Sequence, residues 1–210
     1  MCEPAEPVDT GSTRQFDTLF GAKTYLEVAD LIAEPLRQVL DEVASGHFAH
    51  EAMDVDLLRE FHRRILNHVM PDIAGRWRKK SVRVGGHYPP EHIHVDREMR
   101  ELFDSFHSRL DYCADDVELQ LEALAYLEAQ ALHIHPFEDF NGRAVRVMVA
   151  EAMRRLDFPV LELSVERDTG EHAKYVLALR EWDQHRSLAL LCEFWRDVRF
   201  GLLEDGTENR

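Results

Sequence analysis

Apolar residues recur three or four positions apart along most of this chain, a spacing that gives a helix one apolar face. Six stretches show the pattern: residues 26–40, 57–69, 99–110, 117–132, 145–156 and 175–198. The first fits one helix or a helix pair, and the last supplies the closing helices. The fifth is expected to end near Asp157, because Pro159 follows and cannot continue a helix. The pattern therefore predicts an all-α fold.

One stretch departs from this spacing. Residues 81–84 (SVRV) alternate polar and apolar, and the turn residues Gly85-Gly86 and Pro89-Pro90 follow them. Alternation that ends in such residues predicts a short strand or hairpin arm. We therefore expect a helical bundle that carries one small β-hairpin flap. Residues 1–15 and 204–210 are polar and are expected to be flexible tails around a domain at residues 16–203.

Composition excludes several classes of protein. The chain has 210 residues, which suits one domain. It carries 25 basic and 40 acidic residues, a net charge of -15, and this argues against a nucleic-acid partner. The local basic cluster at residues 76–83 is interpreted as a solvated base of the flap, with contact to an acidic target as the weaker alternative.

The expected compartment is the cytoplasm. Three cysteines, Cys2, Cys113 and Cys192, are too few and too scattered for a disulfide framework. No apolar run approaches the length needed to span a bilayer, and the first residues include Glu3 and Glu6 rather than the apolar stretch of a secretory signal. We therefore expect no membrane partner.

The candidate chemistry lies in residues 135–146 (HPFEDFNGRAVR), between the fourth and fifth helices. A helix N-terminus offers backbone N–H groups and a positive dipole end to a phosphate. Asn141 and Gly142 suit a close approach of the backbone to a ligand. Arg143 and Arg146 are three positions apart, so they share a helix face, and their guanidinium groups match phosphate oxygens.

Two further residues complete this set. Asp139 offers a hard oxygen ligand to Mg²⁺, and His135 can accept a proton near neutral pH. A base, a metal carboxylate, an anion cradle and two phosphate clamps are the parts that phosphoryl or nucleotidyl transfer requires.

The segment resembles the signature of the Fic family, His-Pro-Phe-x-Asp/Glu-Gly-Asn-Gly-Arg-x-x-Arg, at every defined position except one. Residues 57–62, 74–76, 82–90 and 175–182 also resemble family segments, so the resemblance covers roughly residues 20–200. It implies a Fic-type helical bundle. It also implies a protein adenylyltransferase that moves AMP from ATP, with Mg²⁺, to a Ser, Thr or Tyr hydroxyl of a target protein.

The resemblance implies a role for each matching residue. His135 would deprotonate the target hydroxyl, and Asp139 would hold Mg²⁺ between the α- and β-phosphates. Asn141 and Gly142 would form the anion hole. Arg143 would grip the β- and γ-phosphates and Arg146 the γ-phosphate. The flap would pair with an extended target segment by strand addition; its residues are Val82, Arg83, Val84, Gly85 and Gly86.

The one departure is Phe140, where the family usually has Gly. Phe tolerates a positive φ poorly, so either the loop needs no such geometry there or the phosphate nest is distorted. A ring beside the nucleotide would also change which nucleotide fits. Two alternatives therefore stay open: a Fic-fold enzyme that uses another nucleotide or phosphate donor or removes AMP, and a catalytically weak binding module.

The sequence also bears on regulation and on a second kind of metal site. Many family members carry an inhibitory Ser/Thr-x-x-x-Glu helix, and the nearest match here, residues 164–168, has Asp in the Glu place. Restraint would then come from a separate antitoxin-like protein, or there is none; a homodimer also stays open. The pairs His92/His94 and His133/His135 lack a cysteine or carboxylate set for zinc, so they are interpreted as surface or capping histidines.

Overall fold

The computed structural model describes residues 14–159, 165 and 169–200. The chain begins with an antiparallel hairpin of β1 (Gln15–Thr18) and β2 (Gly21–Thr24), whose register pairs Gln15 with Thr24 and Thr18 with Gly21. The remaining elements are helical: α1 (Tyr25–Leu31), α2 (Ala33–Ala44), α3 (Val55–Leu66), η1 (His92–His94), α4 (Val95–Cys113), α5 (Val117–Ile134), α6 (Asn141–Arg155), α7 (Gly170–His185), α8 (Ala189–Phe194) and a π-helical turn (Trp195–Arg199).

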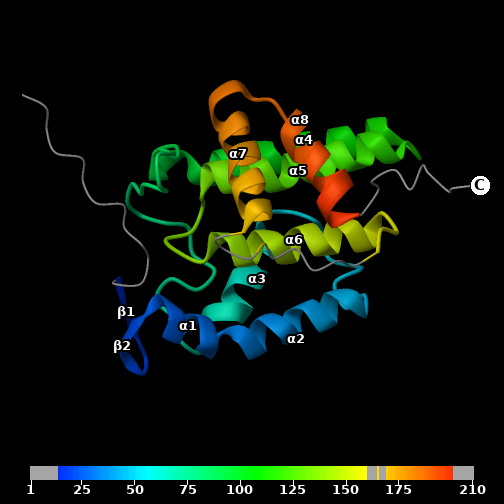
Figure 1. Ribbon diagram of the computed structural model, residues 1–210. Coiled ribbons are helices and arrows are strands. Elements are labelled where there is room, and N and C mark those ends of the chain that lie inside the picture. The colour runs from blue at the N-terminus through cyan, green and yellow to red at the C-terminus, as the bar shows by residue number, and fades with distance from the viewer. Residues whose placement is uncertain (1–13, 160–164, 166–168, 201–210) are drawn as a thin grey trace, which may run out of the picture.

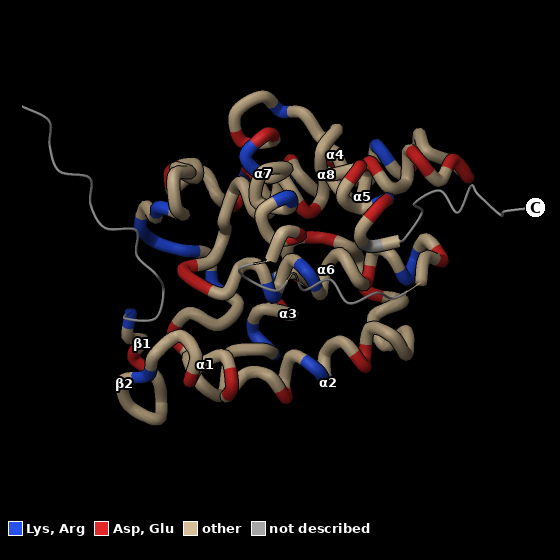
Figure 2. The backbone as a smooth tube through the Cα atoms, in the orientation of Figure 1, with Lys and Arg blue, Asp and Glu red and all other residues tan. Residues whose placement is uncertain are grey.

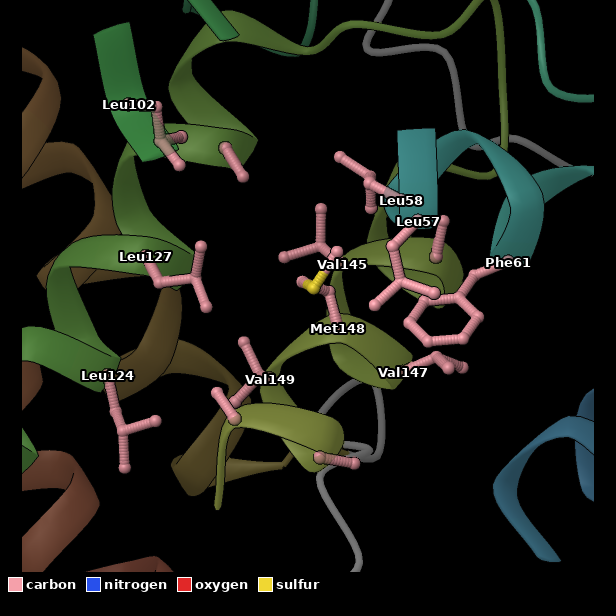
Figure 3. Packing of buried hydrophobic residues seen from close by; sticks show 14 of the residues in the cluster. Leu57, Leu58, Phe61, Leu102, Leu124, Leu127, Val145, Val147, Met148 and Val149 are labelled. Carbon is pink, nitrogen blue, oxygen red and sulfur yellow. The ribbon is translucent and has the colours of Figure 1, made fainter. Parts of the chain in front are cut away.

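Helix α6 is the centre of the bundle (Figure 1). It packs against α2, α3 and α5, while α4 lies along α5, and α7 and α8 cover α5 from the far side. Val145, Met148 and Val149 of α6 lie toward Leu124 and Leu127 of α5. On another face Val147 lies toward Phe61 of α3 (Figure 3). Burial on both faces holds the N-terminus of α6 in a fixed place.

Side-chain caps explain where several helices begin. Thr24 and Glu27 form a reciprocal capping box at α1, and Asp54 and Asp116 accept backbone N–H bonds at the starts of α3 and α5. Each such cap contributes about 1 kcal/mol. Within the described part of the chain, no helix has the length and apolar content needed to cross a membrane.

A buried carboxylate joins the closing helices to the core. Glu128 of α5 has no exposed surface, and its two oxygens accept hydrogen bonds from Tyr175 Oη at 2.8 Å and Trp195 Nε1 at 2.9 Å. A buried acidic group is tolerated only with such partners. This polar contact therefore fixes α7 and the Trp195 turn on α5.

The structure confirms the all-α prediction and its six helical stretches, with the first resolved into α1 and α2. At the flap the expected hairpin turn is present, but the expected strand is not. Among the described residues, the flap makes one isolated bridge, Val84 with His87, around the turn Gly85-Gly86. No neighbouring strand extends this pairing, and the two-stranded hairpin instead lies at residues 15–24. The segment considered for inhibition, residues 164–168, lies outside the described residues except for Val165.

Candidate active site

His135 lies immediately after α5, as its C-terminal cap. Its backbone is left-handed, with φ 51° and ψ 62°, and this turns the chain sharply into the loop that leads to α6. The His135 carbonyl accepts a hydrogen bond of 2.8 Å from Arg78 Nε. Burial lowers the pKa of His135 to about 4, and the nearby positive charge of Arg78 also lowers it. At neutral pH the imidazole is therefore uncharged and able to accept a proton.

Two side chains hold the loop between α5 and α6. The ring of His62, on α3, stacks on Phe137 with centroids 3.7 Å apart. Its Nδ1 accepts the Gly75 N–H at 2.9 Å, so its Nε2 donates to the Asp139 carbonyl at 3.0 Å. Asn141 holds the same loop from α6, because its amide accepts the Phe137 N–H at 2.8 Å and donates to the Phe137 carbonyl at 3.0 Å.

The N-terminus of α6 faces open space. The Asn141 side chain is buried in its contacts with Phe137, so what Asn141 offers to an anion is its backbone N–H. A Cβ placed on Gly142 would meet no described atom within 4 Å. A helix leaves its first N–H groups without intrahelical partners, so this half-buried turn, with open space at Gly142, can bind a phosphate.

Phe140 adopts the left-handed geometry that its family position suggests. Its φ is 56° and its ψ 21°, which costs a non-glycine residue about 1–2 kcal/mol. The ring is buried, and it stacks on Tyr25 at 5.7 Å and contacts Phe16 at 5.6 Å. Aromatic packing of the Phe140 ring against the N-terminal hairpin and α1 thus offsets the backbone strain at Phe140. The loop therefore has the left-handed turn that a glycine would form without strain.

Arg143 and Arg146 both extend from the first turns of α6, as their spacing predicts. Arg143 donates from Nη1 to the Tyr25 hydroxyl at 3.2 Å, and its guanidinium lies 5.1 Å from the Phe140 ring centroid. Arg146 donates from Nε to the Gly142 carbonyl at 3.0 Å. Both guanidinium groups lie beside the open helix N-terminus.

Asp139 is the candidate metal ligand, and a cationic side chain already lies against it. Arg14 Nη1 is 2.6 Å from Asp139 Oδ2, and the Asp139 side chain is 15% exposed. Burial raises the pKa of Asp139, while the charge of Arg14 opposes that rise. A buried carboxylate oxygen whose position accommodates a positive charge fits Mg²⁺, which takes one or two carboxylates together with substrate phosphates.

The flap forms one wall of a groove of about 580 Å³ that reaches His135. Residues 84–88 lie on one side, and Val176, Leu179, Arg180 and Asp183 of α7 lie on the other. In Figure 2 the basic residues of the flap base gather near the end of the molecule where α6 begins. The prediction that this cluster is wholly solvated is wrong for Arg78, which is 3% exposed.

Arg78 instead joins the flap to the end of α5 and to His135 by hydrogen bonds. It donates to the carbonyls of Ile134, His135, Lys80 and Pro90. Its pKa is lowered by burial but stays far above neutral pH for a guanidinium, so the charge is matched by four carbonyl dipoles. The sequence predicted neither this contact nor those of Arg14 and His62, because their partners at residues 134–139 are 56 or more positions away.

Comparisons with known proteins agree with this arrangement. The Fic/DOC family matches residues 52–153. The chain is 33% identical over 128 residues to the protein adenylyltransferase Fic of Nematostella vectensis, which covers 60% of this chain and 28% of that protein. It is 31% identical over 129 residues to the protein adenylyltransferase fic-1 of Caenorhabditis elegans, which covers 61% of this chain and 25% of that protein. The chain thus spans about a quarter of the length of these relatives.

The fold is also similar to that of a solved effector protein. BepC of Bartonella tribocorum, whose crystal structure contains AMPPNP, superposes with a TM-score of 0.68 over 90% of this chain and 94% of that one, at 16% identity. The match over residues 52–153 and the similarity of the fold both agree with the resemblance of residues 135–146 to the Fic family.

Proposed function

We propose that this protein transfers AMP from ATP to a hydroxyl group of a target protein. The observation that carries the proposal is the position of His135. Its uncharged imidazole lies in the groove between flap and α7, and five residues of backbone separate it from the open N-terminus of α6. A proton acceptor and a candidate phosphate cradle at the two ends of one loop support a single reaction at this site.

The proposed reaction is an in-line displacement at the α-phosphorus of ATP. The target hydroxyl loses its proton to His135 as its oxygen bonds to phosphorus. The bond from the α-phosphorus to the bridging oxygen breaks, and pyrophosphate leaves. The backbone N–H groups of Asn141 and Gly142 stabilise charge on the α-phosphate, while Arg143 and Arg146 bind the β- and γ-phosphates.

Asp139 would hold the Mg²⁺ that accompanies ATP, and the ion would supply neutralisation of phosphate charge. Arg14 would have to leave Asp139 for a cation to bind at Oδ2, the oxygen that Arg14 contacts. The backbone N–H groups of the first turn of α6, together with the two arginines, would position the phosphates of ATP. Such positioning accounts for most of the catalysis in phosphoryl transfer.

Two observations on similar proteins support this proposal. The relatives described above are named protein adenylyltransferases, and the crystal structure of BepC contains AMPPNP. The left-handed backbone at Phe140 supports catalysis over a binding module, because the loop has the turn that a glycine would give. A changed donor remains the second proposal, since Phe140 places an aromatic ring beside Arg143.

The partners are proposals as well. The target would approach through the groove and pair with the exposed flap residues 83–86. A separate antitoxin-like inhibitor, a cytoplasmic location and the absence of nucleic-acid and membrane partners stay predictions from the sequence. Co-purification with a small protein that contains Ser/Thr-x-x-x-Glu would support the inhibitor, and a harmless active enzyme without any partner would contradict it.

Incubation with α-labelled ATP, Mg²⁺ and a cell lysate tests the activity. Label should appear on protein bands with the wild type and with His94→Ala, a control at an exposed histidine, and should be lost with His135→Ala. Label that persists in His135→Ala would refute its role as base. Absence of α-label together with transfer from γ-labelled ATP or from another nucleotide would favour the second proposal.

A further inference from the structure

Three potential metal ligands meet in the groove beside His135, outside the set that the proposed reaction uses. His87 comes from the flap turn, His133 from the last turn of α5, and Asp183 from α7. One ligand atom of each lies within 4.8 Å of the others. The three residues are half-buried and line the same groove as His135.

The hydrogen bonds of His87 fix which nitrogen faces the cluster. His87 Nε2 lies 2.8 Å from the His133 carbonyl, which can only accept, so Nε2 carries a proton. In a neutral ring the lone pair is then on Nδ1, which lies 3.5 Å from Asp183 Oδ2. Either a proton on Nδ1 or a bound cation satisfies these two atoms, and a metal ion would do so for His133 as well. A histidine that donates one ring N–H to a backbone carbonyl also has the orientation common among metal-ligating histidines.

The separations suit a first-row transition metal. Bonds of about 2.0–2.1 Å in tetrahedral geometry place neighbouring ligand atoms about 3.3 Å apart. Here the two histidines approach different oxygens of one carboxylate: His133 Nδ1 lies 2.8 Å from Asp183 Oδ1, and His87 Nδ1 lies 3.5 Å from Asp183 Oδ2, so both separations are near that value. Two imidazoles and one carboxylate favour zinc over Mg²⁺, which prefers oxygen ligands.

We propose that His87, His133 and Asp183 form a site for Zn²⁺ or a similar divalent transition metal, with the fourth position open to water. The ion would join the flap to α5 and α7, elements that are 46 and 96 positions away from His87 in sequence. It would hold one wall of the groove in place next to His135. This site does not depend on the proposed reaction.

Arg186 is a competitor for this site. Its Nη2 lies 2.8 Å from His133 Nε2, and because a guanidinium only donates, Nε2 is the acceptor and Nδ1–H points to Asp183. When Nδ1 binds a metal, the proton must move to Nε2 and Arg186 must turn away. Arg186 is exposed, so it can do so, and its removal should strengthen metal binding.

Isothermal titration of the full chain with Zn²⁺ tests the site. We expect one site whose affinity falls at least about 10- to 100-fold in His87→Ala and in Asp183→Asn, since even indirect ligand supports cost that much. His94→Ala, an exposed histidine at η1, should bind as the wild type does, and Arg186→Ala should bind more tightly. Mg²⁺ should give no heat that depends on Asp183.

Hydrogen exchange gives a second readout. Zn²⁺ should slow the exchange of the amides of residues 84–88 in the wild type and not in Asp183→Asn, a variant of nearly unchanged shape. Equal Zn²⁺ affinity in wild type, His87→Ala and Asp183→Asn would overturn the proposal, and so would unchanged exchange of the flap in a zinc-saturated wild type.

Discussion

Replacing Phe140 by glycine removes a backbone strain and an aromatic contact at the same time. The strain is the left-handed conformation at φ 56°. The contact is the packing of a 5% exposed ring against Tyr25 and Phe16. The family usually has glycine here, so a reader of sequences alone would expect Phe140→Gly to repair the loop.

The magnitudes indicate the opposite for stability. Truncation of a buried Phe costs about 3–5 kcal/mol in free energy of unfolding. Glycine relieves about 1–2 kcal/mol of left-handed strain. It also loses about 0.4–1 kcal/mol through the greater freedom of the unfolded chain. The expected net loss is about 3 kcal/mol, which for a chain of this size lowers Tm by about 6–12 °C.

Thermal and urea unfolding of wild type, Phe140→Gly and Phe140→Ala measure these effects. Both variants lose the ring, but only alanine keeps the strain, so Phe140→Gly should be more stable than Phe140→Ala by about 1 kcal/mol. A Phe140→Gly protein as stable as the wild type would show that the contacts with Tyr25 and Phe16 contribute little, and would refute the reasoning.

Three further predictions concern titration and the metal carboxylate. The pKa of His62 is about 4 in the folded protein, against an ordinary value of 6.5, so between these pH values the unfolded chain binds more protons than the folded one. The free energy of unfolding should therefore fall by about 3 kcal/mol as the pH drops from about 6.5 to 4. The urea midpoint should fall less steeply with pH in His62→Gln than in the wild type, and an equal fall in both would contradict this reasoning. The kcat/KM for AMP transfer should be constant from about pH 6 to 8 and should decrease as the pH approaches the pKa of His135, about 4. A decrease that is already centred at pH 6.5 would show that burial does not set this pKa. Arg14→Ala should tighten the binding of Mg·ATP by up to about fivefold, because the ion pair of Arg14 with Asp139 no longer has to be broken. Weaker binding of Mg·ATP in titration calorimetry would mean that Arg14 contacts phosphate instead.

The helices, and the closeness of the candidate site residues, could be predicted from the sequence for the same reason: each depends on residues close together in the chain. Apolar spacing located the helices, and residues 135–146 hold the candidate base, the candidate metal carboxylate and both arginines in one loop and helix turn. The flap strand failed because alternation of polar and apolar residues needs a partner strand, and Val84 pairs only with His87.

Contacts between distant segments could not be predicted. In the sequence His133 lies beside His135, whereas its partners in space are His87 and Asp183. Arg14 belongs to a segment expected to be a flexible tail, and nothing local links it to Asp139. Such pairings follow from packing of whole helices, which a single sequence does not specify.

The hydrogen bonds of Arg78 have a consequence for how the flap sequence can vary between related proteins. A single side chain binds the carbonyls of Lys80 and Pro90, the two ends of the flap, and ties both to the end of α5. Residues 81–89 are therefore a loop closed at its base, and their length and composition can change without altering the loop that begins at His135. Where the flap binds a target as proposed, exchange of this loop with that of a related protein should change which target is bound and leave the candidate site residues unchanged.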